Sequence, residues 1–149
     1  MADVTISSLP PGTPSSSAIL PYSQGGQTYS TTLAQLSALP FIPKAFVAFN
    51  GYDNFTIVGG ETRCQIWNSY NIQKVVKVNT GQYNVYFNTP MSSTPYCVSG
   101  SMGDVQNVGN ERISIYASVM YSSYFMVHSY LYNDNLGDNA YIGLTIFSN

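Results

Sequence analysis

Charged side chains are scarce in this sequence. Asp, Glu, Lys and Arg make up 8% of its 149 residues, against roughly 25% in typical soluble domains. The net charge is −2, so the charge balance does not favour binding to nucleic acid or to an anionic membrane surface. Uncharged polar side chains must therefore keep the protein in solution, and Ser, Thr, Asn and Gln are abundant.

Long apolar runs and a cysteine framework are also missing. No stretch of about 18 apolar residues occurs, so we expect no membrane span. Met1–Val4 has no basic region followed by an apolar segment, so we expect no signal peptide. Cys64 and Cys97 lie outside any CxxC spacing. We expect both thiols to be reduced. A disulfide between them is the alternative if the protein belongs to a particle that matures outside a cell.

Motifs of catalysis are absent from the sequence. It contains no Gly-x-Ser-x-Gly elbow, no phosphate-binding loop and no Gly-x-Gly-x-x-Gly. The single histidine, His128, is expected to point to the face of its strand opposite to Val127. We expect its side chain to be hydrogen-bonded or to lie at the surface, rather than to act as a general base. We therefore predict a protein that is not an enzyme and needs no cofactor. A glycosidase would need two converging carboxylates, and the candidates are Asp3, Asp53, Glu61, Asp104, Glu111, Asp134 and Asp138.

The segment Asn133–Asn139 is rich in Asn, Asp and Gly. Its oxygen ligands are of the kind that calcium prefers, but the glycine is misplaced for an EF-hand loop and no terminal glutamate follows. We interpret the segment as a hairpin turn and predict no metal site.

Residues typical of β-strands dominate the second half of the chain. Hydrophobic residues make up 44% of the sequence, and tyrosine occurs 13 times. Tyr83, Val85 and Phe87 alternate with polar neighbours, which is the period of a half-buried strand. Turn signals such as Thr80-Gly81 separate the candidate strands. These strands are Ala45–Asn50, Phe55–Val58, Cys64–Tyr70, Val75–Val78, Tyr83–Asn88, Tyr96–Met102, Arg112–Met120, Phe125–Tyr132 and Tyr141–Phe147.

The sequence predicts two parts. Residues 44–149 are expected to form an antiparallel, jelly-roll-like β-sandwich, because short strands recur at regular spacing. Few charged residues protect its strand edges, which favours oligomerisation. Residues 1–43 hold six of the eight prolines and are predicted to be an extended arm with one short helix. Thr32 and Gln35 form a weak capping box for that helix. The arm is interpreted as a docking strap, with a disordered tail as the alternative.

The tyrosines admit two readings. Most are expected to fill a core or a subunit interface, but aromatic faces can also stack on sugars. Tyr121 and Tyr124 flank a predicted turn between strands, where exposed rings would suit contact with a glycan. Trp67, the lone tryptophan, is expected to be buried near the strand pairing.

Several segments resemble a β-domain of bacteriophage virion proteins, seen in tail-fibre and head-fibre tips. The resemblance rests on Lys44–Gly51, Ser69–Ile72, Thr80–Met91 and Tyr96–Val98, which read KAFVAFNG, SYNI, TGQYNVYFNTPM and YCV. Residues 4–10, 19–23 and 28–33 are similar to the N-terminal attachment segments of phage fibres and spikes. The resemblance implies a trimeric β-structured projection that is anchored to the virion by its N-terminus, and it implies no catalytic residue.

From this resemblance we expect a short trimeric fibre or spike, assembled in the host cytoplasm and located in the virion. Its partners would be two further copies of itself, other virion proteins in the capsid, neck or tail, and host surface glycan. A stand-alone carbohydrate-binding module is the main alternative, and a depolymerase tip is a third hypothesis. The residues expected to dock on the virion are Val4, Ile6, Leu9, Ile19, Leu20, Tyr22, Tyr29, Leu33 and Leu36.

Overall fold

Twelve β-strands account for almost all the regular secondary structure in the computed structural model, which describes residues 17, 19–24, 26–32, 35, 39, 42–103, 112–131 and 134–148. At 20, 22, 23 and 112–118 only the backbone is described. The chain divides into two units, Met1–Ile42 and Pro43–Asn149. The predicted all-β class is confirmed.

The strands follow one another along the chain with little intervening structure. They are β1 (Ile19–Gln24), β2 (Gln27–Thr32), β3 (Ala45–Phe49), β4 (Thr56–Val58), β5 (Glu61–Arg63), β6 (Ile66–Tyr70), β7 (Ile72–Asn79), β8 (Gln82–Phe87), β9 (Cys97–Gly103), β10 (Arg112–Met120), β11 (Tyr124–Tyr130) and β12 (Tyr141–Phe147).

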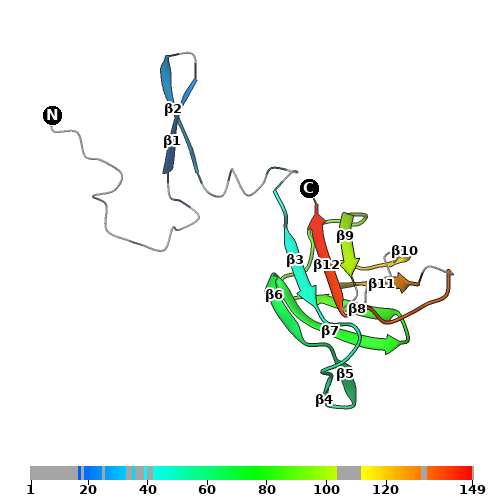
Figure 1. The fold of residues 1–149 in the computed structure, drawn as a ribbon. Helices are drawn as coiled ribbons and strands as arrows, with labels where there is room; N and C mark the ends of the chain where they lie inside the picture. The colour runs from blue at the N-terminus through cyan, green and yellow to red at the C-terminus, as the bar shows by residue number, and fades with distance from the viewer. Residues whose placement is uncertain are drawn as a thin grey trace. The chain divides into compact units, whose positions relative to one another are not determined.

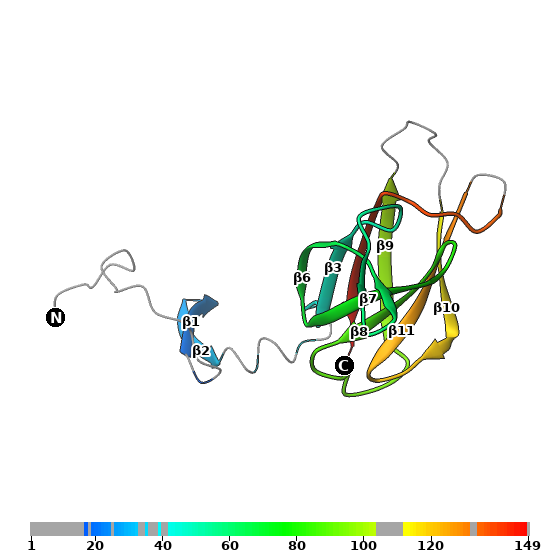
Figure 2. The ribbon, with the colours of Figure 1, turned by 90° about the horizontal axis from the view of Figure 1, so that it is seen from below.

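The second unit contains two antiparallel sheets (Figures 1 and 2). One has four strands in the order β6-β3-β12-β9, and the other has six in the order β10-β11-β8-β7-β5-β4. In Figure 1, β3 and β12 lie in front of β7, β8 and β11. Buried side chains from both sheets belong to one core cluster, so the sheets pack face to face as a β-sandwich.

The core follows from the period-two pattern of the strands. In β8, Tyr83, Val85 and Phe87 are buried while their neighbours are half-buried, as the sequence predicts. β3 and β12 show the same alternation toward the same core. The largest fully buried apolar side chains are Tyr83, Phe49, Phe125, Ile142, Ile146, Val47, Val75, Val85 and Val127.

A sharp corner joins the two sheets between β6 and β7. Asn71 adopts a left-handed φ of 56° there, a conformation that Asn tolerates better than most residues. Its side-chain amide donates to the carbonyls of Lys44 at 3.3 Å and Thr89 at 3.0 Å. Its Oδ1 accepts the Thr89 N–H at 2.7 Å. Asn71 therefore fixes the point at which the chain passes from one sheet to the other.

A polar network joins three loops at one end of the β-sandwich. Asp138 pairs with the Lys77 ammonium group and accepts the Gly81 N–H at 2.8 Å. The Tyr83 hydroxyl lies 2.8 Å from Asp138 Oδ1 and 2.9 Å from the Gly51 carbonyl oxygen. Burial, with the Asp138 carboxylate beside it, raises the pKa of Tyr83 far above its ordinary value. These contacts hold three separate loops together.

In the first unit, the described residues include a β-hairpin. β1 and β2 pair from Ile19–Thr32 to Gln24–Gln27, so this part of the predicted arm consists of two extended strands that pair with each other. Gly26 has a φ of 79° at the turn, which favours glycine. Thr32 and Gln35 exchange the reciprocal bonds of a capping box, at 2.9 and 3.1 Å, while most of the expected helix lies outside the described residues.

Two further expectations about local structure are corrected. The predicted strand Cys64–Tyr70 begins two residues too early, because β6 starts at Ile66, while the unpredicted strand β5 at Glu61–Arg63 belongs to the six-stranded sheet. Trp67 is not buried, since 44% of its surface is exposed. The register between β3 and β6 shifts at Ala48 and Phe49. This bulge leaves Trp67 as an extra residue that turns outward.

Candidate binding surface

The outer face of the four-stranded sheet carries a row of exposed side chains. Because Val47, Leu144 and their alternating neighbours point into the core, the residues between them point outward. The outward positions are Phe46 and Ala48 in β3, Trp67, Asn68 and Tyr70 in β6, Tyr141, Gly143 and Thr145 in β12, and Cys97, Ser99 and Ser101 in β9. We call this surface the outer face.

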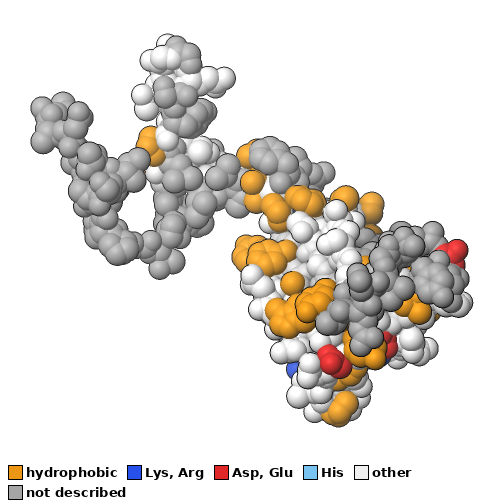
Figure 3. Space-filling model, viewed as in Figure 1, with side chains coloured by type: hydrophobic (Ala, Val, Ile, Leu, Met, Phe, Trp, Pro, Cys, Tyr) orange, Lys and Arg blue, Asp and Glu red, His pale blue; other side chains and the backbone are white. Residues whose placement is uncertain are grey.

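Two pairs of aromatic rings stand on the outer face. Phe46 and Tyr70 are stacked with ring centroids 6.3 Å apart. The rings of Trp67 and Tyr141 lie 5.0 Å apart with 34° between their planes. All four residues are exposed, by 36%, 59%, 44% and 49% for Phe46, Tyr70, Trp67 and Tyr141. In Figure 3, hydrophobic side chains gather over β3, β6 and β12 with uncoloured surface between them.

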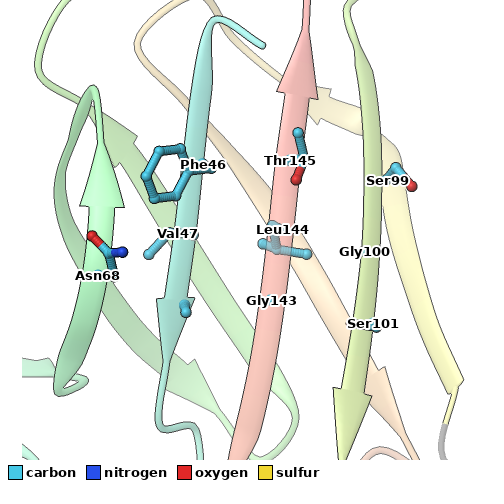
Figure 4. Close-up of a pocket in the computed structure, with 10 residues that line it drawn as sticks. Phe46, Val47, Asn68, Ser99, Gly100, Ser101, Gly143, Leu144 and Thr145 are labelled. Carbon is cyan, nitrogen blue, oxygen red and sulfur yellow. The ribbon is translucent and has the colours of Figure 1, made fainter.

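Small side chains form a hollow between the aromatic pairs. A depression of about 500 Å³ is lined by Phe46, Ala48 and Gly143 together with polar side chains. A second, of about 430 Å³, shares Ala48 and Gly143 and extends to Trp67 and Tyr141. Figure 4 shows the first depression, with no side chain on β12 at Gly143. We call the two adjoining depressions the groove.

The described lining of the groove is polar and uncharged. Asn68, Ser99, Ser101 and Thr145 supply amide and hydroxyl groups, and none of the described lining residues is Lys, Arg, Asp or Glu. Such a surface can stack against an uncharged ring and can donate and accept hydrogen bonds.

The predicted glycan residues Tyr121 and Tyr124 lie on the other sheet. The structure brings them together with Tyr86: the Tyr121 and Tyr124 rings are 4.9 Å apart, and Tyr86 stacks on Tyr124 at 5.0 Å. The Lys74 ammonium group lies 4.6 Å from the centre of the Tyr86 ring and pairs with Glu61. This tyrosine cluster is therefore a second aromatic surface, with charged groups beside it.

The only histidine in the sequence is a satisfied, buried side chain. His128 is 6% exposed, and its ring nitrogens lie 3.3 Å from the Tyr130 hydroxyl and 3.5 Å from Gln82 Nε2. Burial lowers its pKa below the ordinary value. These contacts agree with the expectation that His128 is a packing residue.

The described carboxylates and thiols also have identifiable surroundings. Glu61 pairs with Arg63 and Lys74, and the hydrogen bond from Lys74 is the largest cause of its lowered pKa. Cys64 is buried and Cys97 exposed, and both are free thiols. Burial raises the pKa of Cys64 to about 12. Among the described residues, no three His, Cys, Asp or Glu side chains come close enough to bind a metal ion.

Of the residues predicted to dock on the virion, Ile19 and Tyr29 are described with their side chains, which are 67% and 43% exposed. Leu20 and Tyr22 lie in β1 with only the backbone described. The others lie outside the described residues, namely Val4, Ile6, Leu9, Leu33 and Leu36.

No family model matches the chain, and no curated protein or solved structure matches it either. In the part of the chain that is described, no helix has the length and apolar character needed to cross a membrane.

Proposed function

We propose that this protein is a non-enzymatic structural protein of a bacteriophage virion. In this proposal it forms a short trimeric fibre or spike, anchored by the first unit and exposing the second. The second unit serves as a jelly-roll-like head for decoration or host attachment, and the arm carries a short helix that begins after Thr32. The protein acts mechanically, and three copies raise the avidity of weak surface contacts.

The observation that carries this proposal is the exposed hairpin of the first unit. Isolated two-stranded hairpins are marginally stable in water. β2 has no buried side chain, and Ile19 and Tyr29 expose large apolar surfaces. None of the residues in this unit whose side chains are described is buried. Such a hairpin gains stability by laying its apolar side chains on a partner, as an attachment segment would.

The head supports the same role because it has its own core. Every member of the core cluster lies between Ala45 and Ile146, within the unit Pro43–Asn149. The head can therefore fold without the first unit. Among the described carboxylates, Glu61 and Asp138 are held in ion pairs with lysine or arginine, and Asp53 accepts hydrogen bonds from the Asn50 and Asn54 amides. Such contacts favour a structural role over a hydrolytic one.

Virion incorporation tests the proposal. Phage particles that lack this protein would be complemented with the full chain or with a chain that begins at Pro43. We expect the full chain to copurify with particles and the shorter chain to remain free, with unchanged far-UV circular dichroism of the head. Incorporation of the shorter chain at the full-chain level, or unfolding of that chain, would falsify the anchoring role.

A stand-alone carbohydrate-binding module is the second candidate, and the groove favours it. An exposed aromatic surface with amide and hydroxyl groups is suited to sugars whether or not the protein is part of a virion. This candidate predicts a monomer with a saturable glycan site, whereas the fibre or spike predicts three chains. The mass in solution separates them.

A further inference from the structure

We propose that the groove on the outer face binds a neutral oligosaccharide. One part of the sugar chain would stack on the Phe46–Tyr70 pair and another on the Trp67–Tyr141 pair. Asn68 and the serine hydroxyls would bond the sugar hydroxyls between them. The inference gives the attachment role a ligand class and a location, and it rests on that role for its biological setting.

Four large aromatic residues stand exposed on the outer face in two pairs. Exposed aromatic rings on both sides of a hollow with polar groups are typical of a binding site. Aromatic ring faces are electron-rich, and the C–H groups of a pyranose ring carry the complementary partial charge. Phe46 and Tyr70 stack with only 25° between their planes, so their exposed sides can present a nearly continuous platform.

A glycine lies at the centre of the floor of the groove. Gly143 lies in the interior of β12, which is hydrogen-bonded to β3 and β9. Glycine weakens a strand interior, and its presence there often marks the close approach of a ligand. A Cβ on Gly143 would lie 3.8 Å from Ser101 Oγ and 3.9 Å from its carbonyl oxygen, which is ordinary contact. The described packing does not require a glycine, so a partner on the open side explains it best.

The groove matches an uncharged oligosaccharide in size and in charge. Depressions of about 500 and 430 Å³ fall within the range of small-molecule sites. Their described lining residues offer donors and acceptors but no charged side chain to balance a sulfated, phosphorylated or sialylated sugar. An uncharged oligosaccharide satisfies both the aromatic walls and the polar floor. A second copy of the chain would instead have to bring a protruding segment into the hollow.

The lone tryptophan provides a direct readout. Trp67 lies in the wall of the groove, so its fluorescence reports on a sugar that stacks there. The full chain would be titrated with hexasaccharides of glucose, mannose and N-acetylglucosamine, and with a sialylated oligosaccharide as a charged comparison. We expect a saturable change in Trp67 emission with at least one neutral sugar and none with the charged one.

Variants then test the location. Gly143→Val places a β-branched side chain on the floor, where it suits the strand, so the urea midpoint should not fall while affinity falls by about tenfold or more. Tyr70→Ala should also weaken binding, because it removes half of one aromatic pair. Tyr121→Ala, in the tyrosine cluster of the other sheet, separates the groove from the glycan site that the sequence predicts at Tyr121 and Tyr124, and it should bind like the parent protein.

Several results would overturn the proposal. These are no saturable change with any neutral sugar, unchanged affinity in Gly143→Val, and loss of binding in Tyr121→Ala. Tighter binding of the sialylated sugar contradicts the neutral ligand class. A lower solution mass for Gly143→Val would mean that the outer face is an interface between copies. None of these titrations measures virion incorporation, so failure of the groove and failure of the anchoring role are distinguishable.

Discussion

The indole of Trp67 packs against the ring of Tyr141, with their centroids 5.0 Å apart. The two residues belong to β6 and β12, which are not neighbours, because β3 lies between them. The rings therefore meet across the outward side of β3, where Ala48 supplies the only side chain of that strand in this part of the groove. This contact forms one wall of the groove and joins two residues that lie 74 positions apart in the sequence.

Replacing Tyr141 with alanine should increase the exposure of Trp67, which is already 44% exposed. We expect the fluorescence maximum to move to longer wavelength and the free energy of unfolding to fall by about 1 kcal/mol, the usual value of an aromatic pair. Emission spectra and urea denaturation measure both quantities. An unshifted spectrum would show that the two rings are not in contact in solution, and Tyr121→Ala serves as the control with no expected spectral change.

Two turn glycines with nearly equal φ should respond very differently to alanine. Gly81 has φ +64° and its added Cβ would lie 2.5 Å from the Ser129 carbonyl oxygen. Gly59 has φ +60° with nothing within 4 Å. The left-handed conformation costs about 1–2 kcal/mol for alanine at either site.

The backbone clash adds to that cost only at the first site, so Gly81→Ala should lose more than about 3 kcal/mol of unfolding free energy. Urea denaturation of the two variants measures the difference. Equal losses would mean that the β7–β8 turn does not pack under Ser129 as described.

The two thiols should differ in reactivity in the native protein. Cys97 is exposed, while Cys64 is buried with its pKa raised to about 12, so almost no Cys64 thiolate is present near neutral pH. An aromatic disulfide reagent should label one thiol per chain at pH 8 and two in urea. Cys97→Ser should abolish the native labelling. Labelling of no thiol in urea without reductant, and of two after reduction, would reveal a disulfide between them.

Protonation of His128 should destabilise the fold. Its pKa is lowered by burial, so in the unfolded chain it takes up a proton first, near its ordinary pKa of about 6.5. The unfolding free energy is therefore fully present above that pH and decreases as the pH falls below it. The pKa of Glu61 is also lowered, so its contribution to the unfolding free energy is lost in a more acidic range, as the pH falls below about 4.5.

Urea denaturation between pH 7.5 and 5.5 measures this effect. We expect a steeper loss of unfolding free energy for the parent protein than for His128→Gln, which keeps a polar group near Tyr130 and Gln82. Parallel curves for the two proteins would mean that His128 does not titrate differently in the folded and unfolded states.

Sequence periodicity predicted the parts of the fold that depend on local pattern. Arg112–Met120 and Tyr141–Phe147 match β10 and β12 at both ends, because alternating apolar residues and flanking turn residues define them. β5 was missed since its three residues, Glu-Thr-Arg, carry no hydrophobic pattern. Trp67 was misplaced because a single-residue bulge reverses the direction of a side chain.

The groove could not be predicted because it depends on strand order. Phe46, Tyr70 and Gly143 come together only through the arrangement β6-β3-β12-β9, which sets residues far apart in sequence side by side. The outward sequence Tyr141, Gly143, Thr145 was the available signal, since a glycine between two outward side chains interrupts an otherwise regular strand. The contacts of Asp138 with Lys77 and Tyr83, 61 and 55 residues away, left no local signal at all.

The mass of the purified chain in solution tests the proposed fibre or spike most directly. It would be measured for the full chain and for the chain that begins at Pro43, by light scattering coupled to size-exclusion chromatography. We predict a trimer in solution in both cases, because the head assembles the trimer and the first unit is left to anchor it. A monomer in both forms would contradict the account and favour an independent carbohydrate-binding module.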